Sequence, residues 1–344
     1  METTLSLREA FEQLKESEPK LRIREYAKRL NASEAELVAL GVGTTAVRLR
    51  PEFVAILGEI ESLGFVMALT RNDDVVHERK GVYENFSTTP HASLFVGKDI
   101  DLRIFPSVWA YAFAVTEGEG KQARHSLQFF TTDGVATHKI YTESRSNMEA
   151  YEALVAKYTD ENQSSELEIG AALPLESAEL PDNEIDVKAF QEAWLNLKDT
   201  HEFYGLLKKH KLTRTQALRF APDETHAKKT DNKALRRALE AAAKEQVSIM
   251  VFVGNAGMIQ IHTGEVKNIV EHGPWINVLD PHFNLHAKED AIAESWIVRK
   301  PTEDGIVTSL ELFNAKKELI CTLFGARKPG IPELESWRKL IAEL

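Results

Sequence analysis

The 344-residue sequence has little of what secreted and membrane-spanning proteins require. Cys321 is its only cysteine, which excludes an internal disulfide framework and any zinc site built from several cysteines. No apolar run reaches the length of a membrane-spanning helix, and the N-terminal residues lack the apolar core of a signal peptide. These absences predict a cytoplasmic protein that is not embedded in a membrane.

Basic residues are also in short supply. Lysine and arginine together number 42 against 53 aspartates and glutamates, so the formal net charge is -11. A nucleic acid or an anionic membrane would need a broad basic face, so neither is expected as a partner. Hydrophobic residues make up 43% of the chain, which indicates an ordinary folded protein. Any anionic ligand must then be held by a local group of cations.

No lysine or arginine lies between Lys157 and Lys188, and this stretch is rich in acidic and small polar residues with two prolines. Such a composition is typical of an exposed linker. We therefore predict an acidic linker over residues 160–186, between an N-terminal half over 1–159 and a C-terminal half over 187–344. A length of 344 residues suits such a division.

The two halves have the same order of patterns. Each begins with helical periodicity and continues with segments that alternate as strands do. A single shift of 183 residues, which takes Met67 to Met250, also takes Asn72 to Asn255 and Phe130 to Phe313. Apolar alternation and turns keep phase under this shift, which favours an internal duplication. The alternative is that two unrelated antiparallel sheets share their turn spacing.

His201 opens a short amphipathic segment. Asp199 or Thr200 is the expected helix cap, which places His201 in the first turn and off the apolar stripe. That stripe consists of Phe203, Leu206, Leu207 and His210. The partial positive charge at a helix N-terminus disfavours imidazolium and leaves a ring nitrogen as a lone-pair donor, which suits a metal ligand. Most of the 11 histidines of such a chain lie on the surface or form hydrogen bonds, so local sequence alone does not assign this role.

Basic residues follow His201 closely. The group comprises Lys208, Lys209, Lys211, Arg214 and Arg219. A cluster of this kind is usually a solvated helix face. In a negatively charged protein it is also what a dianionic ligand would require.

Several motifs of the C-terminal half resemble one family. They are DTHEFYGLLKKHKLTRTQALR, VFVGNAGMIQIHTG, GPWINVLDPHFNLH, WIVRKPTEDGIVTSLELF and LFGARKPGIPELESWR. On these motifs the chain resembles the bacterial hemin-degrading factors, cytoplasmic proteins that receive imported haem and traffic or degrade it. The resemblance extends over essentially the whole chain. It implies an α+β fold of two similar halves, each with N-terminal helices and an antiparallel sheet, the sheets meeting centrally.

The resemblance also implies a site for haem b. It makes His201 the proximal iron ligand, and it places Arg103 and Phe105 of the segment DLRIF on the distal side. Positions around the haem edge and its propionates correspond to Arg214, Lys300 and Arg327, and Phe252 corresponds to an aromatic of the pocket wall. Phe324 stands where some relatives have tyrosine, so a hydrogen bond to a propionate is expected to be missing there.

The residue types suit this assignment, because a haem site calls for one axial base, an apolar and aromatic cleft, and cations near the propionates. Arg103 stays protonated and is a poor iron ligand, but it is a capable donor to a distal ligand. The first hypothesis is therefore a haem-degrading protein that behaves like a haem oxygenase, with Arg103 and His201 as its catalytic residues. It would receive haem from an import system and electrons from a donor protein.

Two other functions stay open at this point. One is a haem carrier that passes its ligand to a separate haem oxygenase, which requires only a strong and releasable site. The other is a duplicated binding or scaffold protein for a different anionic ligand.

Overall fold

The structure, a computed structural model, describes residues 5–173, 179–328 and 330–344. Two compact units are present. Among the described residues, unit 1 contains those up to Thr70 together with Arg79–Leu173 and Asn255–Ile259. Unit 2 contains Arg71–Glu78, the described part of Pro174–Gly254, and Gln260–Leu344. Each unit therefore includes a short segment from the opposite half of the sequence.

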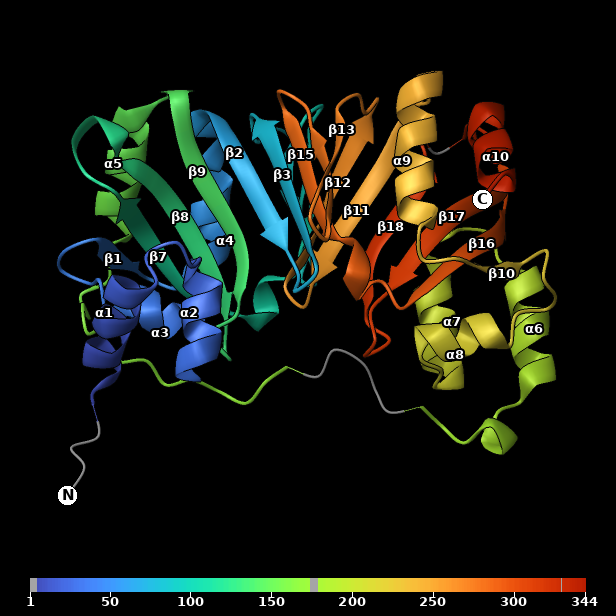
Figure 1. Ribbon diagram of the computed structural model, residues 1–344, viewed down its shortest axis with the longest axis horizontal. Helices are drawn as coiled ribbons and strands as arrows, with labels where there is room; N and C mark the ends of the chain where they lie inside the picture. The colour runs from blue at the N-terminus through green and yellow to red at the C-terminus, as the bar shows by residue number, and fades with distance from the viewer. Residues whose placement is uncertain (1–4, 174–178, 329) are drawn as a thin grey trace. The chain divides into compact units, whose positions relative to one another are not determined.

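The N-terminal half contains five α-helices and nine strands in its described residues (Figure 1). The helices are α1 (Leu7–Ser17), α2 (Ile23–Leu30), α3 (Glu34–Ala39), α4 (Phe53–Glu59) and α5 (Met148–Tyr158). The strands are β1 (Ala46–Leu49), β2 (Gly64–Arg71), β3 (Val75–Gly81), β4 (Phe86–Thr88), β5 (Ser93–Val96), β6 (Asp101–Ile104), β7 (Trp109–Glu117), β8 (Arg124–Thr131) and β9 (Ala136–Ser146).

The C-terminal half repeats this order in the part of the chain that is described. Its helices are α6 (Val187–Leu195), α7 (Glu202–His210), α8 (Arg214–Arg219), α9 (Ala234–Glu245) and α10 (Glu335–Ala342). Its strands are β10 (Ala227–Thr230), β11 (Ile249–Asn255), β12 (Met258–Gly264), β13 (Ile269–His272), β14 (Trp275–Leu279), β15 (Phe283–Lys288), β16 (Glu294–Thr302), β17 (Gly305–Phe313) and β18 (Leu319–Gly325).

The strands form two antiparallel sheets, each with nine strands among the described residues. The strand orders are β1-β7-β8-β9-β2-β3-β15-β14-β13 and β10-β16-β17-β18-β11-β12-β6-β5-β4. Each order becomes the other when every strand is replaced by its counterpart in the other half. The α+β fold with two repeated halves is thus confirmed.

Hydrogen bonds confirm the shift of 183 residues at the level of single side chains. The amide of Asn72 donates to the backbone oxygen of Ile320 at 2.8 Å, within unit 2. The amide of Asn255 donates to the backbone oxygen of Thr137 at 2.9 Å, within unit 1. Donor and acceptor both move by the same shift. A buried carbonyl needs a hydrogen-bond donor, and in each half an asparagine amide at the equivalent position supplies it.

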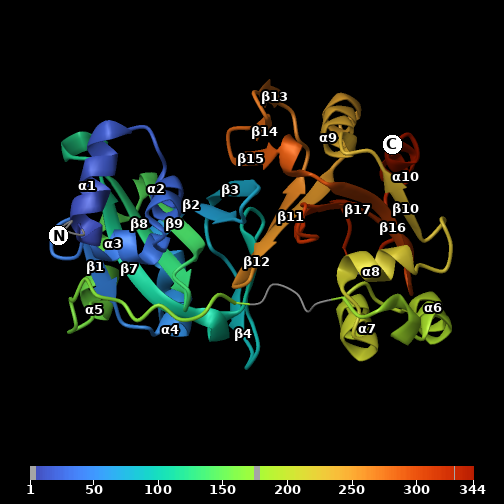
Figure 2. The same cartoon turned by 60° about the horizontal axis from the view of Figure 1, so that its bottom comes forward.

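Helices of unit 2 cover both faces of the part of the second sheet that contains β16, β17 and β18 (Figures 1 and 2). On β16, Trp296 and Val298 pack with apolar residues of α6, α7 and α8. Ile297, which points to the opposite face, packs with residues of α9 and α10. The period of two along the strand thus divides its residues between two hydrophobic cores.

The predicted linker is largely exposed, but both of its described ends contact the folded units. On unit 1 the backbone N–H of Gly170 donates to the Thr132 oxygen at 2.8 Å. On unit 2 the Glu179 carboxylate accepts from Arg219 at 3.0 Å and from Lys317 at 2.8 Å. Hydrogen bonds from Arg219 and Lys317 lower the pKa of Glu179 to about 2. Residues 174–178 of the predicted linker lie outside the described residues.

Two simpler expectations can be compared with the structure. Cys321 is buried as expected, and burial raises the pKa of its thiol to about 12. Within the described ranges no helix combines the length and the apolar content that a membrane span needs.

A buried histidine makes the stability of unit 1 depend on pH. His138 is 1% exposed, with Nδ1 2.9 Å from the Thr70 hydroxyl and Nε2 2.6 Å from the Tyr83 hydroxyl. Burial lowers the pKa of His138 to about 3. The unfolded chain takes up a proton on this side chain near pH 6.5, so its contribution to stability is complete above that pH and falls as the pH approaches 3.

We therefore expect the His138 contribution to the free energy of unfolding to decrease by about 2 kcal/mol between pH 7 and pH 5. Urea unfolding gives the free energies of unfolding of the native protein and of His138→Gln at both pH values. The difference between the two proteins should change by this amount from pH 7 to pH 5. A difference that is the same at both pH values would contradict the expectation.

Candidate functional site

His201 is the N-cap residue of α7, which corrects the expectation that it lies in the first turn. The residues expected to cap the helix form the preceding turn instead, because the backbone N–H of Glu202 donates to Asp199 and that of Phe203 donates to Thr200. The His201 side chain is 90% exposed. The imidazole therefore projects into solvent where α7 begins.

Asp199 holds the His201 side chain and backbone together. Its Oδ1 accepts from the His201 backbone N–H at 2.7 Å and lies 2.5 Å from the ring Nδ1. The hydrogen bond from the backbone N–H lowers the pKa of Asp199, so its carboxylate is ionised and only accepts. In the neutral form of the ring, Nδ1 then carries the hydrogen and Nε2 has the lone pair. Metal-binding histidines commonly have this carboxylate contact.

A buried carboxylate brings two of the predicted cations together. Glu311 of β17 is 0% exposed and accepts from Arg214 Nε at 2.7 Å and from Arg214 Nη2 at 2.8 Å. Lys300 Nζ of β16 donates to the same carboxylate at 2.9 Å, and the Ser309 hydroxyl donates at 3.0 Å. Burial alone would raise the pKa of Glu311, but Arg214 and Lys300 hold it well below its ordinary value. Glu311 therefore pairs with both cations at once.

Both cations also lie over one aromatic ring. The Arg214 guanidinium is 5.5 Å from the centre of the Phe203 ring, and Lys300 Nζ is 4.5 Å from it. Phe203 belongs to α7 and follows His201 by two residues. The start of α7 is thereby connected to the charged cluster through a cation-π contact.

Arg327 is held by a separate acid. Its Nη2 donates to Asp304 at 3.2 Å, in the turn between β16 and β17. In the same turn the backbone N–H of Glu303 donates to the Lys198 oxygen at 2.9 Å, just before His201. Arg327 Nε is buried and has no hydrogen-bond partner among the described residues. A buried donor without a partner is unfavourable, and a ligand carboxylate could satisfy it.

An aromatic surface lies on the same face of the sheet. Phe252 of β11 and Phe324 of β18 are both partly exposed, and their ring centres are 5.1 Å apart in an edge-to-face arrangement. Phe324 is directly opposite Ser309 in the pairing of β17 with β18. Since Ser309 and Glu311 share a face of β17, the two aromatic rings adjoin the charged cluster.

The predicted distal residues belong to unit 1. Arg103 lies on β6, where its guanidinium pairs with Asp101 and donates to the Leu102 oxygen. Burial raises the pKa of Asp101, and Arg103 opposes this effect. The backbone N–H of Phe105 donates to the Gly257 oxygen at 2.8 Å, and the Phe105 side chain is partly exposed. Arg103 is therefore fixed by an acid two residues before it, as His201 is.

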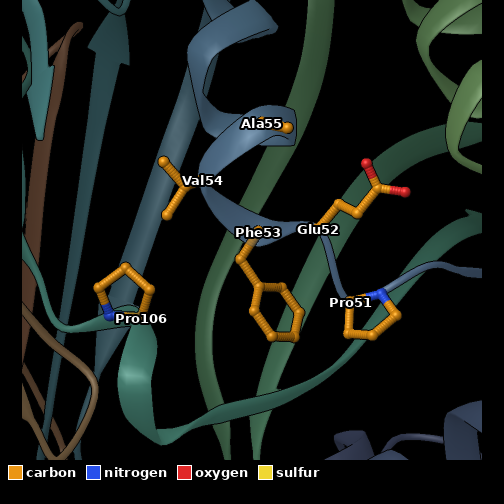
Figure 3. Close-up of a pocket in the computed structure, with 6 residues that line it drawn as sticks. All are labelled: Pro51, Glu52, Phe53, Val54, Ala55 and Pro106. Atoms are coloured by element: carbon orange, nitrogen blue, oxygen red, sulfur yellow. The ribbon is translucent and has the colours of Figure 1, made fainter. Parts of the chain in front are cut away.

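Unit 1 also has a surface hollow at the start of α4 (Figure 3). Its lining residues are Pro51, Glu52, Phe53, Val54, Ala55 and Pro106. None of the residues predicted to bind haem lines it. With one carboxylate and otherwise apolar residues, it does not suit a dianion.

Sequence reasoning missed the acids that hold the predicted residues, namely Asp199, Glu311 and Asp304. The signal for Glu311 was the alternation of side chains along β17, because Glu311 shares its inward face with Ser309 and Phe313. Asp199 and Asp304 offered no comparable signal, since acids are common in turns.

These features define a class of protein: a duplicated α+β protein whose C-terminal half carries an exposed, carboxylate-held histidine near a group of cations and aromatic rings. The model of the haemin-degrading HemS/ChuX domain matches residues 31–158 and 211–344. The chain belongs to this family, which confirms the resemblance drawn from its motifs.

Individual relatives cover nearly the whole chain. The hemin transport protein HmuS of Yersinia pestis is 42% identical over 98% of this chain and 97% of its own length. The crystal structure of holo-PhuS, a heme-binding protein from Pseudomonas aeruginosa, matches with a TM-score of 0.94 at 48% identity and covers 97% of both chains. The heme-degrading enzyme ChuS of Escherichia coli O157:H7 matches with a TM-score of 0.91 at 36% identity, over 98% of this chain and 99% of its own.

The buried cluster leads to a prediction about stability. Glu311→Gln leaves two cations without their anion, so we expect the free energy of unfolding at pH 7 to fall by about 3 kcal/mol. Glu289→Gln is the matched control, because Glu289 forms a similar two-bond pair with Arg236, at 2.9 and 2.6 Å, in a more exposed position. Its loss should cost less than about 1 kcal/mol. Equal losses in urea unfolding would show that burial of Glu311 has no special effect.

Proposed function

We propose that this protein binds haem received from an import system and opens its macrocycle, with release of iron. The observation that carries the proposal is the exposed His201 imidazole, whose Nδ1 is held by Asp199 at 2.5 Å and whose Nε2 is left for a metal. The family supports it, since its model is described as haemin-degrading. The ligand would be haem b, and the protein would act in the cytoplasm.

The residues of unit 2 fit such a ligand. His201 would ligate the iron, while Arg214, Lys300 and Arg327 would bind the two propionates. Phe252 and Phe324 would form an aromatic wall against the porphyrin. The fit is supported by Arg327 Nε, which is buried and has no hydrogen-bond partner in the described part of the chain. Arginine and lysine together suit carboxylates, because one binds with a planar fork and the other as a point charge.

Arg103 and Phe105 would act on the distal side. The Arg103 guanidinium keeps its charge and has donors besides the one that contacts Asp101, so it would hydrogen-bond a distal ligand. Phe105 would exclude water beside it. Bound haem would supply the redox chemistry, and the protein would orient it and leave one face of the iron open.

A carrier that delivers haem to a separate oxygenase is the second candidate. Its specific support is the 42% identity to a protein named as a hemin transport protein over 98% of this chain. The enzymatic candidate is supported by a relative of 36% identity named as a heme-degrading enzyme. An enzyme would need an electron-donor partner, whereas a carrier would need a haem-acceptor protein.

The role of His201 is tested by His201→Ala. We expect hemin titration of the native protein to give a sharp Soret band, and the variant to bind at least about tenfold more weakly or with a shifted band, because the axial base is lost. His226→Ala is the matched control, because His226 also lies next to an aspartate, with Nδ1 2.8 Å from Asp223. It should leave the band unchanged. An unaltered spectrum in His201→Ala would remove the proposed ligand.

The role of Arg103 is tested by turnover. We expect Arg103→Ala to retain hemin but to form product at least about tenfold more slowly, because a charge-assisted hydrogen bond to the distal ligand is lost. The hemin complex is incubated with a physiological reductant and catalase, and tetrapyrrole products are identified by mass spectrometry. A defined product from the native protein supports the enzyme, whereas colour loss only without catalase favours the carrier. Equal rates for native protein and variant would exclude a role for Arg103.

A further inference from the structure

Lys300 is an unusual cation because it is almost completely buried. Its side chain is 4% exposed, and its ammonium lies between the Glu311 carboxylate at 2.9 Å and the ring of Phe203. The charged groups that act on it are Glu311 of β17, which favours the ammonium, and Arg214 of α8, which opposes it. Burial lowers the pKa of Lys300 to about 8 even with Glu311 beside it. Among the described residues, Glu311 is the carboxylate on which the charge of Lys300 near neutral pH depends.

The duplicated half shows that the fold itself does not require this carboxylate. Under the shift of 183 residues, Glu311 corresponds to Gln128 and Ser309 to Ser126. Gln128 is 1% exposed and donates to the Ser126 hydroxyl at 3.0 Å, so a glutamine fits the same place on the equivalent strand.

The cations are missing from that half as well. Lys300 corresponds to Glu117 under the same shift. Arg214 is the first residue of α8, and its counterpart at the start of α3 is Glu34. The acid therefore occurs in the half that carries the two cations, and glutamine occurs in the half that lacks them.

We infer that Glu311 is a positioning residue of the proposed haem site: it pairs with the Arg214 guanidinium and the Lys300 ammonium and orients both for the carboxylates of the incoming ligand. This inference rests on the proposed function. Arg214 donates to Glu311 through Nε and Nη2, and this two-bond pair fixes the plane of its guanidinium. Lys300 uses one of its three protons on Glu311. The ligand class is a tetrapyrrole with free carboxylates.

The pairing of Lys300 with Glu311 should make hemin binding depend on pH. A lysine with a lowered pKa contributes its charge below that pKa and loses it as the pH rises through about 8. Affinity for hemin should therefore fall above about pH 8 in the native protein. Without Glu311 the burial of Lys300 is not compensated, so the fall should begin at lower pH.

The experiment is a hemin titration from pH 6.5 to 9 with the native protein, Glu311→Gln and Glu289→Gln. The quantity compared is the Kd of Glu311→Gln divided by the Kd of the native protein. We expect this ratio to be about tenfold larger at pH 8 than at pH 6.5, because one charge-assisted hydrogen bond is lost. Glu289→Gln should follow the native profile. Hemin dimethyl ester, which lacks free carboxylates, should show no difference between Glu311→Gln and the native protein that depends on pH.

Lys300→Met keeps the Arg214 pair with Glu311 and tests the same point if Glu311→Gln folds poorly. Its affinity should lack the fall that the native protein shows near pH 8. NMR of carbon-13-labelled lysines in the ligand-free protein should show one resonance that titrates near pH 8, is absent from Lys300→Met, and moves to lower pH in Glu311→Gln.

The outcomes separate the two proposals. If the native protein binds hemin, two results would overturn this inference alone. One is a pH profile of affinity in Glu311→Gln that parallels the native profile. The other is a decrease of affinity near pH 8 that is unchanged in Lys300→Met. A native protein that takes up no hemin in a manner dependent on His201 would overturn the proposed function together with it.

Discussion

The candidate site depends on the contact between the Glu311 carboxylate and two cations, Arg214 and Lys300. A carboxylate with no solvent exposure is stable only if it is paired, and here it accepts four hydrogen bonds. The partners come from α8, β16 and β17, so one charge fixes the helix against the sheet. Phe203 extends this arrangement to α7, the helix that begins directly after His201.

The same principle recurs at the other predicted binding residues that are basic. Asp199 holds His201, Asp304 holds Arg327, and Asp101 holds Arg103. In a chain with a net charge of -11, acids are plentiful and cations must be kept in place. Pairing restricts the rotamers of long side chains before a ligand arrives, which reduces the entropy lost on binding. A ligand carboxylate then shares a cation that is already oriented.

The two halves keep the same fold but differ in the charges at equivalent places. The equivalent region of unit 1 has the opposite arrangement of charge, with Glu34 on the helix and Lys139 on the strand, 3.5 Å apart and both buried. Backbone features such as the Asn72 and Asn255 hydrogen bonds are the same in both halves. The common frame is therefore set by strands and turns, while the charged side chains under the helices differ between the halves.

The sequence by itself determined the duplication and the order of helices and strands, and its motifs proposed the group of residues that includes His201, Arg214, Lys300 and Arg327. These depend on local periodicity, on a constant shift and on motifs, which are properties of the chain read in one dimension. It placed His201 one residue too far into its helix, because Asp199 and Thr200 both favour a cap and the choice rests on the turn they form.

The tertiary structure decided which acid pairs with which cation. Glu311 lies 97 residues from Arg214 in the sequence, and Asp304 lies 23 residues from Arg327. Such pairs form only when strand register and helix packing bring distant residues within about 3 Å, and short-range patterns contain no information about that distance. Burial, which sets the pKa of Lys300 and of His138, likewise exists only once the sheets and helices have packed.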